Sequence, residues 1–470
     1  MFQSDQTRDD LPLLWLAGFG ISVALFTVQP WSLIVYQVPV QVFLVWLLLG
    51  WLGLFRLSNI SRLWNPYSMI QWFAIGLFLI VLIWQSLIEE RSWLRFQQLS
   101  TGIALSLITA QAVISMRGRR VLFVSLATAG TASSIVAICQ SVDMADWSWQ
   151  GTLYDGQLVR RPSGLEAFPV AFSYSVVGIG IVLLGAAFHD LKNSERLALF
   201  SPRMAMICGG IILVGNIVAL SRSGVLAIIF SLILLAIGMR YMKRRFIPFS
   251  YVAVPLVVLG GLVIFDKATF LDKIQEKSER TEQDVRMGTT FSVFVPVILQ
   301  YPYGIPAAVL ELDRHKRIPS NAAMRNTTTE LKQAFVMSAG YEPHNLFLTV
   351  GLHYGALGVV ALGVFYWVMI SRAVGVLGRT RSRDQQCLSV LATVLLVANA
   401  GLLVHATFHN ASIFAGEMRG WIWVGALGIC VNHLKEQNEI ERLANACISV
   451  NAGGAETFRG CLPGGRGVEQ

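Results

Sequence analysis

The chain has 470 residues, of which 54% are hydrophobic and only 14% are charged. A soluble globular domain is nearer about 25% charged, and the apolar residues here gather in blocks of about 18–25, which is the length that crosses roughly 30 Å of hydrocarbon. This excludes a soluble α/β protein. The net charge of +9 accompanies no basic run interleaved with aromatic residues, so nucleic-acid binding is disfavoured, and the six cysteines form no CxxC pair. Neither a disulfide framework nor a zinc site is indicated.

Twelve apolar spans follow one another, and we expect each to be a transmembrane helix because a lone strand in lipid leaves its backbone unpaired. They are predicted at 11–28, 31–55, 67–88, 97–116, 121–141, 168–188, 204–220, 223–239, 247–265, 344–370, 388–407 and 413–433. The acidic start MFQSDQTRDD does not suit a cleavable signal peptide, so the first span is expected to be an uncleaved helix. Trp93, Trp421 and Trp423 lie near span ends, where aromatic rings favour the membrane surface.

Basic residues gather in alternate short loops, which predicts that both termini are cytoplasmic. These residues are Arg56, Arg62, Arg117, Arg119, Arg120, Lys192, Arg196, Arg203, Arg240, Lys243, Arg244, Arg245, Arg372, Arg379, Arg381 and Arg383. The intervening short loops carry almost no net charge. Joining 204–239 into one helix would invert every later span and place the MKRRF run outside, so we expect two helices there. The predicted organisation is a cytoplasmic segment 1–10, a membrane domain 11–435 and a disordered cytoplasmic tail 436–470.

Two segments on the predicted non-cytoplasmic face are longer than a simple connection. One covers about 141–168, and the other covers about 266–343. A loop as long as the second is usually functional in a compact protein. Within it, FSVFVPVILQYPYGIP is amphipathic but too short to span, so it is expected to lie in the membrane surface or to re-enter the protein.

Arginines on the same face are the candidate anion-binding residues. Arg160 and Arg161 precede a Ser-Gly pair, and physical arguments do not separate the two. Arg222 stands alone between two apolar spans, where an arginine costs roughly 2.5–3.5 kcal/mol to insert and usually faces a cavity or an anion. Arg286 lies in a charged stretch and is indistinguishable from a solvated helix residue by itself.

His344 is the candidate general base, at the mouth of the span 344–370, with Glu342 and Asn345 close enough to orient its imidazole. Guanidinium groups offer bidentate donation to phosphate, and histidine is the usual base near neutral pH. Three arginines and a histidine on one face suit a reaction on a lipid-linked diphosphate, in which the arginines stabilise the leaving group and the histidine accepts a proton from a hydroxyl.

Other polar patterns give weaker signals. His405 and His409 share a helix face at i, i+4, but a metal site needs a third ligand and none is evident, so polar lining is the better interpretation. No DxD, HExxH or Walker motif is present, and we expect neither a metal nor a cofactor.

Four segments resemble those of the O-antigen ligase and O-antigen polymerase superfamily of bacterial membrane enzymes. They are RRPSGLEAFPVAFSY, LSRSGVLA, DVRMGTTFSVFVPVILQYPYGIP and PHNLFLTVGLHYGALG. The last, a His-Asn pair followed by spaced glycines, is the most specific. The similarity covers roughly 60–430. One departure is that many members carry an Asn-Pro-Asn-like element where this chain reads Glu166 to Pro169.

The resemblance implies a membrane glycosyltransferase of the GT-C-like type in the bacterial inner membrane, with its active site facing the periplasm. It implies an undecaprenyl-diphosphate-linked glycan as donor, and a glycan, lipid A core or protein as acceptor. Arg161, Arg222 and Arg286 would then contact the diphosphate or donor sugar, and His344 would activate the acceptor hydroxyl. Ligase and polymerase remain open. The competing class is a transporter or flippase, which is disfavoured because we find no internal repeat and the polar residues gather at one face.

Overall fold

The computed structural model describes residues 11–28, 34–35, 38–55, 66–88, 90–142, 144–145, 151–154, 157–160, 162–166, 169–191, 197, 200–219, 221–241, 295–296, 298–299, 301–304, 345–378, 386–408, 413–414 and 417–452. The described part is helical apart from two short hairpins. Its helices are α1 (Leu13–Val28), α2 (Val40–Phe55), α4 (Met69–Ile88), α5 (Glu90–Ile114), α6 (Met116–Ser141), α7 (Pro169–Asp190), α8 (Pro202–Val218), α9 (Arg222–Tyr241), α16 (Leu346–Leu377), α17 (Gln386–Thr407) and α18 (Gly420–Ala452).

Five helices of the described part are long and apolar enough to cross a membrane: Met69–Leu87, Met116–Ser141, Pro169–Asp190, Leu346–Leu377 and Cys387–Thr407. Together with shorter apolar helices such as α1 and α8 they indicate a multi-pass membrane protein. Eleven predicted spans fall on described helices, and the region 204–239 is divided between α8 and α9. The predicted span at 247–265 lies outside the described residues.

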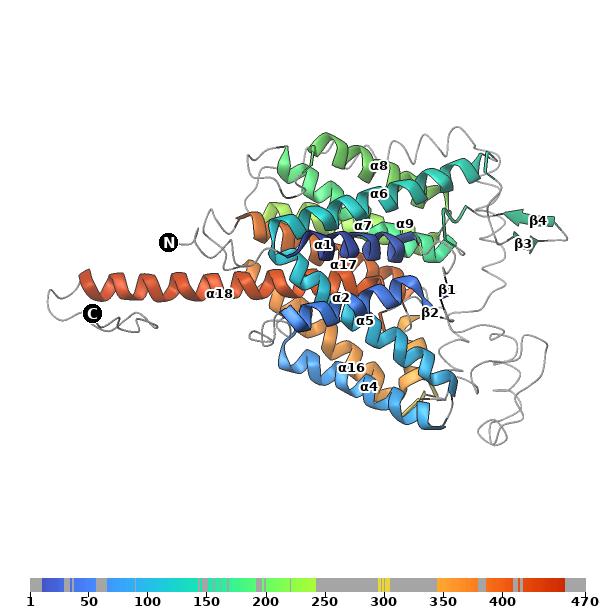
Figure 1. Ribbon diagram of the computed structural model, residues 1–470, viewed down its shortest axis with the longest axis horizontal. Helices are drawn as coiled ribbons and strands as arrows, with labels where there is room; N and C mark the ends of the chain where they lie inside the picture. Colours follow the sequence, from blue (N-terminus) through green and yellow to red (C-terminus); the bar gives the residue numbers. More distant parts are fainter. Residues whose placement is uncertain are drawn as a thin grey trace.

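Two antiparallel hairpins mark one end of the bundle, which we call the hairpin end (Figure 1). Strands β1 (Ile34–Val35) and β2 (Val38–Pro39) pair Ile34 with Pro39, and β3 (Gly151–Tyr154) and β4 (Gln157–Arg160) pair Gly151 with Arg160. The predicted helix start at 31 is therefore wrong, because α2 begins at Val40. Pro39 explains this boundary, since proline disfavours helix at the residue before it and suits a helix start.

Helix α7 is the centre of the bundle. Almost all its side chains are buried, and it packs against α8, α17, α6, α9 and α1 (Figure 1). The faces that contact its neighbours carry small residues, such as Gly180 beside Leu213 of α8 and Gly185 beside Val394 of α17. Small residues let transmembrane helices approach closely, and van der Waals packing then holds them together.

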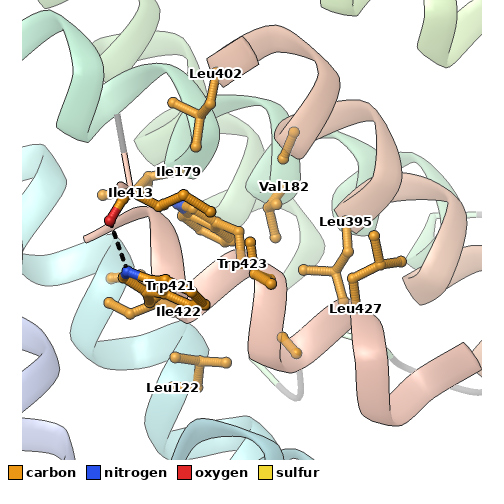
Figure 2. Close-up of a cluster of buried hydrophobic side chains, with 14 of the residues drawn as sticks. Leu122, Ile179, Val182, Leu395, Leu402, Ile413, Trp421, Ile422, Trp423 and Leu427 are labelled. Atoms are coloured by element: carbon orange, nitrogen blue, oxygen red, sulfur yellow. Dashed lines mark hydrogen bonds between the residues drawn. The ribbon is translucent and has the colours of Figure 1, made fainter. Parts of the chain in front are cut away.

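The start of α18 is buried inside the bundle. Trp421 and Trp423 are 0% and 3% exposed, and Figure 2 shows them packed among leucines and isoleucines. The Trp421 Nε1 donates to the carbonyl of Ile413 at 3.0 Å. Our assignment of these two tryptophans to the membrane surface is therefore wrong, because their indoles pack against neighbouring helices and one of them finds its acceptor within the protein.

Helix α18 also corrects both boundaries of the last predicted span. It begins at Gly420 instead of 413 and continues to Ala452, so the tail predicted as disordered from 436 is helical over its first seventeen residues, 436–452. The segment KEQNEIERLANA has neither glycine nor proline and is rich in good helix formers, whereas Gly453 and Gly454 follow it. The helix projects beyond the bundle on the side opposite the hairpin end (Figure 1).

Candidate functional site

Of the residues predicted to carry the chemistry, the three that the structure describes lie at the hairpin end. Arg160 ends β4, Arg222 is the first residue of α9, and Asn345 precedes α16. The other four, Arg161, Glu342 and the predicted key residues Arg286 and His344, lie outside the described residues. The geometry of the site is therefore built from the residues that flank them.

In the Ser-Arg-Ser-Gly turn at the start of α9, each residue around Arg222 makes a specific contact. Ser221 caps the helix, since its Oγ accepts the Gly224 N–H at 3.3 Å. The Ser223 hydroxyl lies 3.1 Å from Ser221 Oγ and 3.2 Å from His405 Nε2. A Cβ at Gly224 would lie 1.9 Å from Ser173 Oγ, so a larger residue at this position would have to displace side chains of α7 and α8. Arg222 thus stands at a helix N-terminus, where backbone N–H groups and the helix dipole favour an anion.

The start of α16 is fixed by Asn345, the residue that follows His344. The Asn345 Oδ1 accepts the N–H groups of Phe347 at 2.9 Å and Leu348 at 3.2 Å, which is an N-cap. Its Nδ2 donates to the Thr407 carbonyl at 3.1 Å, at the end of α17. The Asn345 side chain therefore caps α16 and also ties the start of this helix to the end of α17.

The turn that follows the Arg160–Arg161 pair is held by helix α6. Gln140 Oε1 accepts the N–H groups of Ser163 and Gly164, both at 2.9 Å, and its Nε2 donates to the Gly164 carbonyl at 3.1 Å. Ser133 Oγ accepts the Leu165 N–H at 3.0 Å. Gly164 has φ +61°, a left-handed conformation that glycine adopts without strain. The Ser-Gly pair of this motif is therefore a shaped turn.

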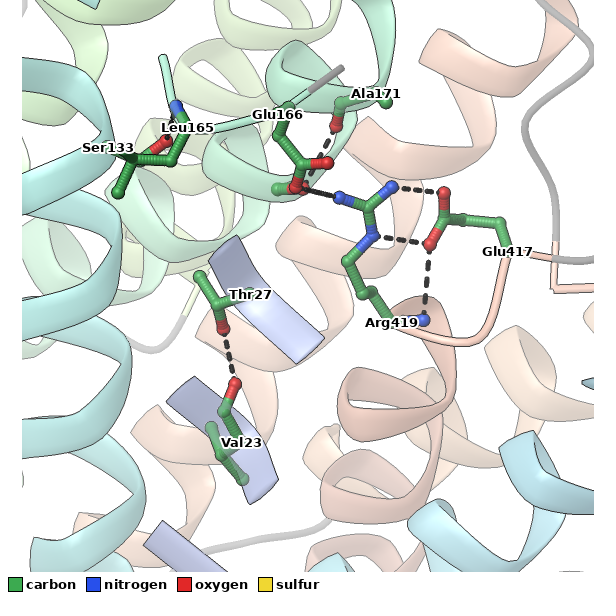
Figure 3. Close-up of polar contacts among 9 residues, drawn as sticks. Val23, Thr27, Ser133, Leu165, Glu166, Ala171, Glu417 and Arg419 are labelled. Atoms are coloured by element: carbon green, nitrogen blue, oxygen red, sulfur yellow. Dashed lines mark hydrogen bonds and ion pairs between the residues drawn. The ribbon is translucent and has the colours of Figure 1, made fainter. Parts of the chain in front are cut away.

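A buried ionic cluster joins that turn to α7 and to the start of α18 (Figure 3). The Arg419 guanidinium donates to Glu166 and Ser175 on one side and makes a bidentate contact with Glu417 on the other. Arg419 and Glu166 are 4% and 3% exposed. Because two carboxylates share one guanidinium, the cluster carries a net charge of −1 when every group is ionised.

Burial is the main influence on the carboxyl group of Glu166, which lies outside the membrane-spanning segments. It raises the pKa of Glu166 to about 7, with the Glu417 carboxylate adding to this rise and Arg419 opposing it. Burial therefore favours the protonated form of the Glu166 carboxyl group.

Helix α17 connects two of the predicted motifs at the hairpin end. Its His405 contacts Ser223, next to Arg222, and its Thr407 accepts from Asn345, next to His344. The His405 ring also packs edge-on against Tyr174, the last residue of the segment RRPSGLEAFPVAFSY. His405 is fully buried, in keeping with a polar lining, and His409 lies outside the described residues.

Arg419 and Glu417 were missed by the sequence prediction, because the span 413–433 enclosed both of them. A signal for this ion pair was available in the sequence, because two charged residues lie two positions apart near the edge of an apolar span. Charged residues rarely lie in hydrocarbon without a partner. Across the described residues no group of three or more His, Cys, Asp or Glu side chains could hold a metal ion.

No protein-family model matches this chain, and no curated protein matches it either.

Proposed function

We propose that this chain is a polytopic membrane glycosyltransferase. It would transfer an undecaprenyl-diphosphate-linked glycan to an acceptor hydroxyl at the hairpin end, as an O-antigen ligase or an O-antigen or exopolysaccharide polymerase. The proposal includes twelve spans, cytoplasmic termini, a GT-C-like fold and a hairpin end that faces the periplasm of a bacterial inner membrane. Loop charge supports this orientation, since the hairpin end carries the segments that lack an excess of basic residues.

The observation that carries the proposal is the meeting of two motifs at the end of α17. Ser223 and Asn345, each the neighbour of a predicted functional residue, both bond to residues in the last turn of this helix. Arg222 at a helix N-terminus suits the diphosphate of the donor, and His344 suits the acceptor hydroxyl. In this mechanism Arg161, Arg222 and Arg286 stabilise the departing lipid diphosphate while His344 accepts the hydroxyl proton.

The alternative, a transporter or flippase for a lipid-linked or small polar substrate, is favoured by one observation. Helix α16 is broken at Gly355, and broken helices mark the binding sites of many transporters. In such proteins the breaks lie near the middle of the membrane. Here the broken turn contacts Gln85, three residues before the end of α4, so the transferase remains the better proposal.

Deletion of the gene followed by lipid analysis tests the proposal. A polymerase predicts that short undecaprenyl-diphosphate glycan accumulates and long polymer is lost, whereas a ligase predicts that full-length lipid-linked polymer accumulates. If neither lipid accumulates, the transferase proposal is wrong.

Point variants test the assigned residues in the same assay. His344→Ala and Arg222→Ala should each abolish complementation of the deletion while the protein remains at wild-type abundance. The matched controls are His433→Ala and Arg442→Ala on α18, and these should complement fully. Full activity of either test variant would remove that residue from the mechanism.

A further inference from the structure

Helix α16 consists of two helices joined at Gly355, whose φ of +72° and ψ of −171° are not helical. The second part, 356–377, is about 33 Å long at 1.5 Å per residue, which matches one membrane crossing. The first part, 346–354, connects α17 to α4, because Asn345 donates to Thr407 and the His353 carbonyl accepts from Gln85. Asn345, the N-cap of this first part, directly follows His344 in the sequence.

The turn Tyr301–Gly304 fills the break in α16. A Cβ at Gly355 would lie 2.0 Å from the Pro302 carbonyl oxygen, and one at Gly304 would lie 2.2 Å from the His353 oxygen. Gly304 has φ +77°, and its N–H donates to the Tyr301 carbonyl at 2.9 Å. The Pro-Tyr-Gly turn and the glycines after the His-Asn pair are thus two complementary surfaces.

Gln85 of α4 joins these two surfaces. It is 2% exposed, and its Nε2 donates to the Tyr303 carbonyl at 3.0 Å and to the His353 carbonyl at 2.7 Å. Backbone carbonyls only accept, so the amide orientation is fixed with Nε2 toward them. The carbonyls of a helix's last turn lack helical partners, and Gln85 supplies one at a break within a largely apolar environment.

The Gln85 side-chain amide makes its two donated bonds at some energetic cost. The Gln85 Oε1 has no hydrogen-bond partner in the part of the chain that the structure describes. A buried unpaired acceptor costs about 1–3 kcal/mol, so a purely apolar packing residue would have been more favourable for α4 by itself. The two donated bonds are therefore the reason for a glutamine at this position.

We propose that Gln85 is a positioning residue for the transfer reaction: by holding the Tyr301–Gly304 turn in the break of α16, it sets the orientation of the half-helix 346–354, whose N-cap follows His344 in the sequence. This inference rests on the proposed function. It also links the segment that follows Arg286 to the segment of His344, since Gln85 bonds to both. A displacement of about 1 Å at a catalytic group lowers a rate by up to about 100-fold.

The test uses the full-length protein in detergent or nanodiscs, with purified undecaprenyl-diphosphate glycan as donor. Gln85→Glu keeps the size of the side chain, but it has no donor when it is ionised and only one donor when it is protonated. We expect kcat to fall by about 10- to 100-fold with KM for the donor unchanged, because the catalytic group is misplaced while the donor site remains. Gln97→Glu, the same change at an exposed position of α5, should behave as wild type.

The pH profile separates positioning from a general loss of structure. The carboxyl group that Gln85→Glu introduces regains one donor when it is protonated, and burial favours the protonated form. The ratio of Gln85→Glu activity to wild-type activity should therefore rise as the pH falls from about 8 to about 5.5. A flat ratio, or a kcat equal to that of Gln97→Glu, overturns the inference.

Two further outcomes are distinguishable. If the wild-type protein does not transfer glycan, the proposed function fails, whereas a working wild type with an indifferent Gln85→Glu defeats only the positioning role. Should Gln85→Glu not accumulate in the membrane, Gly304→Ala replaces it, because it displaces the same turn without changing α4. An unchanged kcat in Gly304→Ala then refutes the inference.

Discussion

Gly355→Ala is the substitution that most directly tests the two-part structure of α16. The φ and ψ of Gly355, +72° and −171°, fall in a region that is essentially restricted to glycine, and a residue held there costs about 1–3 kcal/mol. The added Cβ would also lie 2.0 Å from the Pro302 oxygen, so the Tyr301–Gly304 turn has to move. We expect a total loss of about 2–4 kcal/mol in the free energy of unfolding, with the collision adding about 1 kcal/mol or more to the strain.

Gly363→Ala in the second part of α16 is the matched control. A Cβ at Gly363 would meet nothing within 4 Å, and alanine is about 1 kcal/mol better than glycine within a helix. Thermal unfolding of both variants in detergent, followed by fluorescence-detected size exclusion, should show a lower midpoint for Gly355→Ala and an unchanged or higher one for Gly363→Ala. Equal midpoints would show that α16 is continuous and that the turn does not occupy a break.

Three more substitutions address the hairpin end. Because burial raises the pKa of Glu166 from 4.5 to about 7, the folded state binds more protons than the unfolded state between these values, and wild-type stability falls as pH rises through that window. Denaturation measured from pH 4.5 to 8 should therefore show Glu166→Gln gaining up to about 3 kcal/mol relative to wild type, and a constant difference would contradict this. Arg419→Met leaves Glu166 buried without its cation and should cost about 3–5 kcal/mol, against no loss for Lys435→Met on the exposed surface of α18. Equal abundance of those two variants in membranes would count against the cluster. Gly224→Ala should lower the unfolding midpoint because its Cβ would lie 1.9 Å from a serine hydroxyl, whereas Gly210→Ala meets nothing within 4 Å and should not; the same thermal assay decides between them.

Span length and hydropathy predicted the helical character and most of the described helices, because the cost of burying an unpaired backbone in lipid favours helix. The errors lie where a local feature competes with hydropathy. Pro39 converts the start of one apolar span into a hairpin, and α18 begins only at Gly420 because Arg419 and Glu417 form an ionic cluster before it. An average over a window of apolar residues does not detect either feature.

The candidate site was predicted in part. Residue types and loop charge placed Arg222 and Asn345 at one end of the bundle, where the structure describes them. The residues that hold these segments, Gln140, Gln85 and Arg419, were not predicted, because their roles depend on partners 23 to 268 residues away in the chain. No local pattern encodes such distant pairs.

The length of α18 gives the protein a rigid connection between its two ends. The helix starts directly after Arg419 and continues through its buried tryptophans to Ala452, a rise of about 50 Å for its 33 residues. Its last turns project past the bundle on the far side (Figure 1). Anything that pulls or turns this exposed segment acts through an unbroken rod on the residue that binds Glu166. The ionic cluster is therefore mechanically connected to the opposite end of the bundle, although it is almost completely buried.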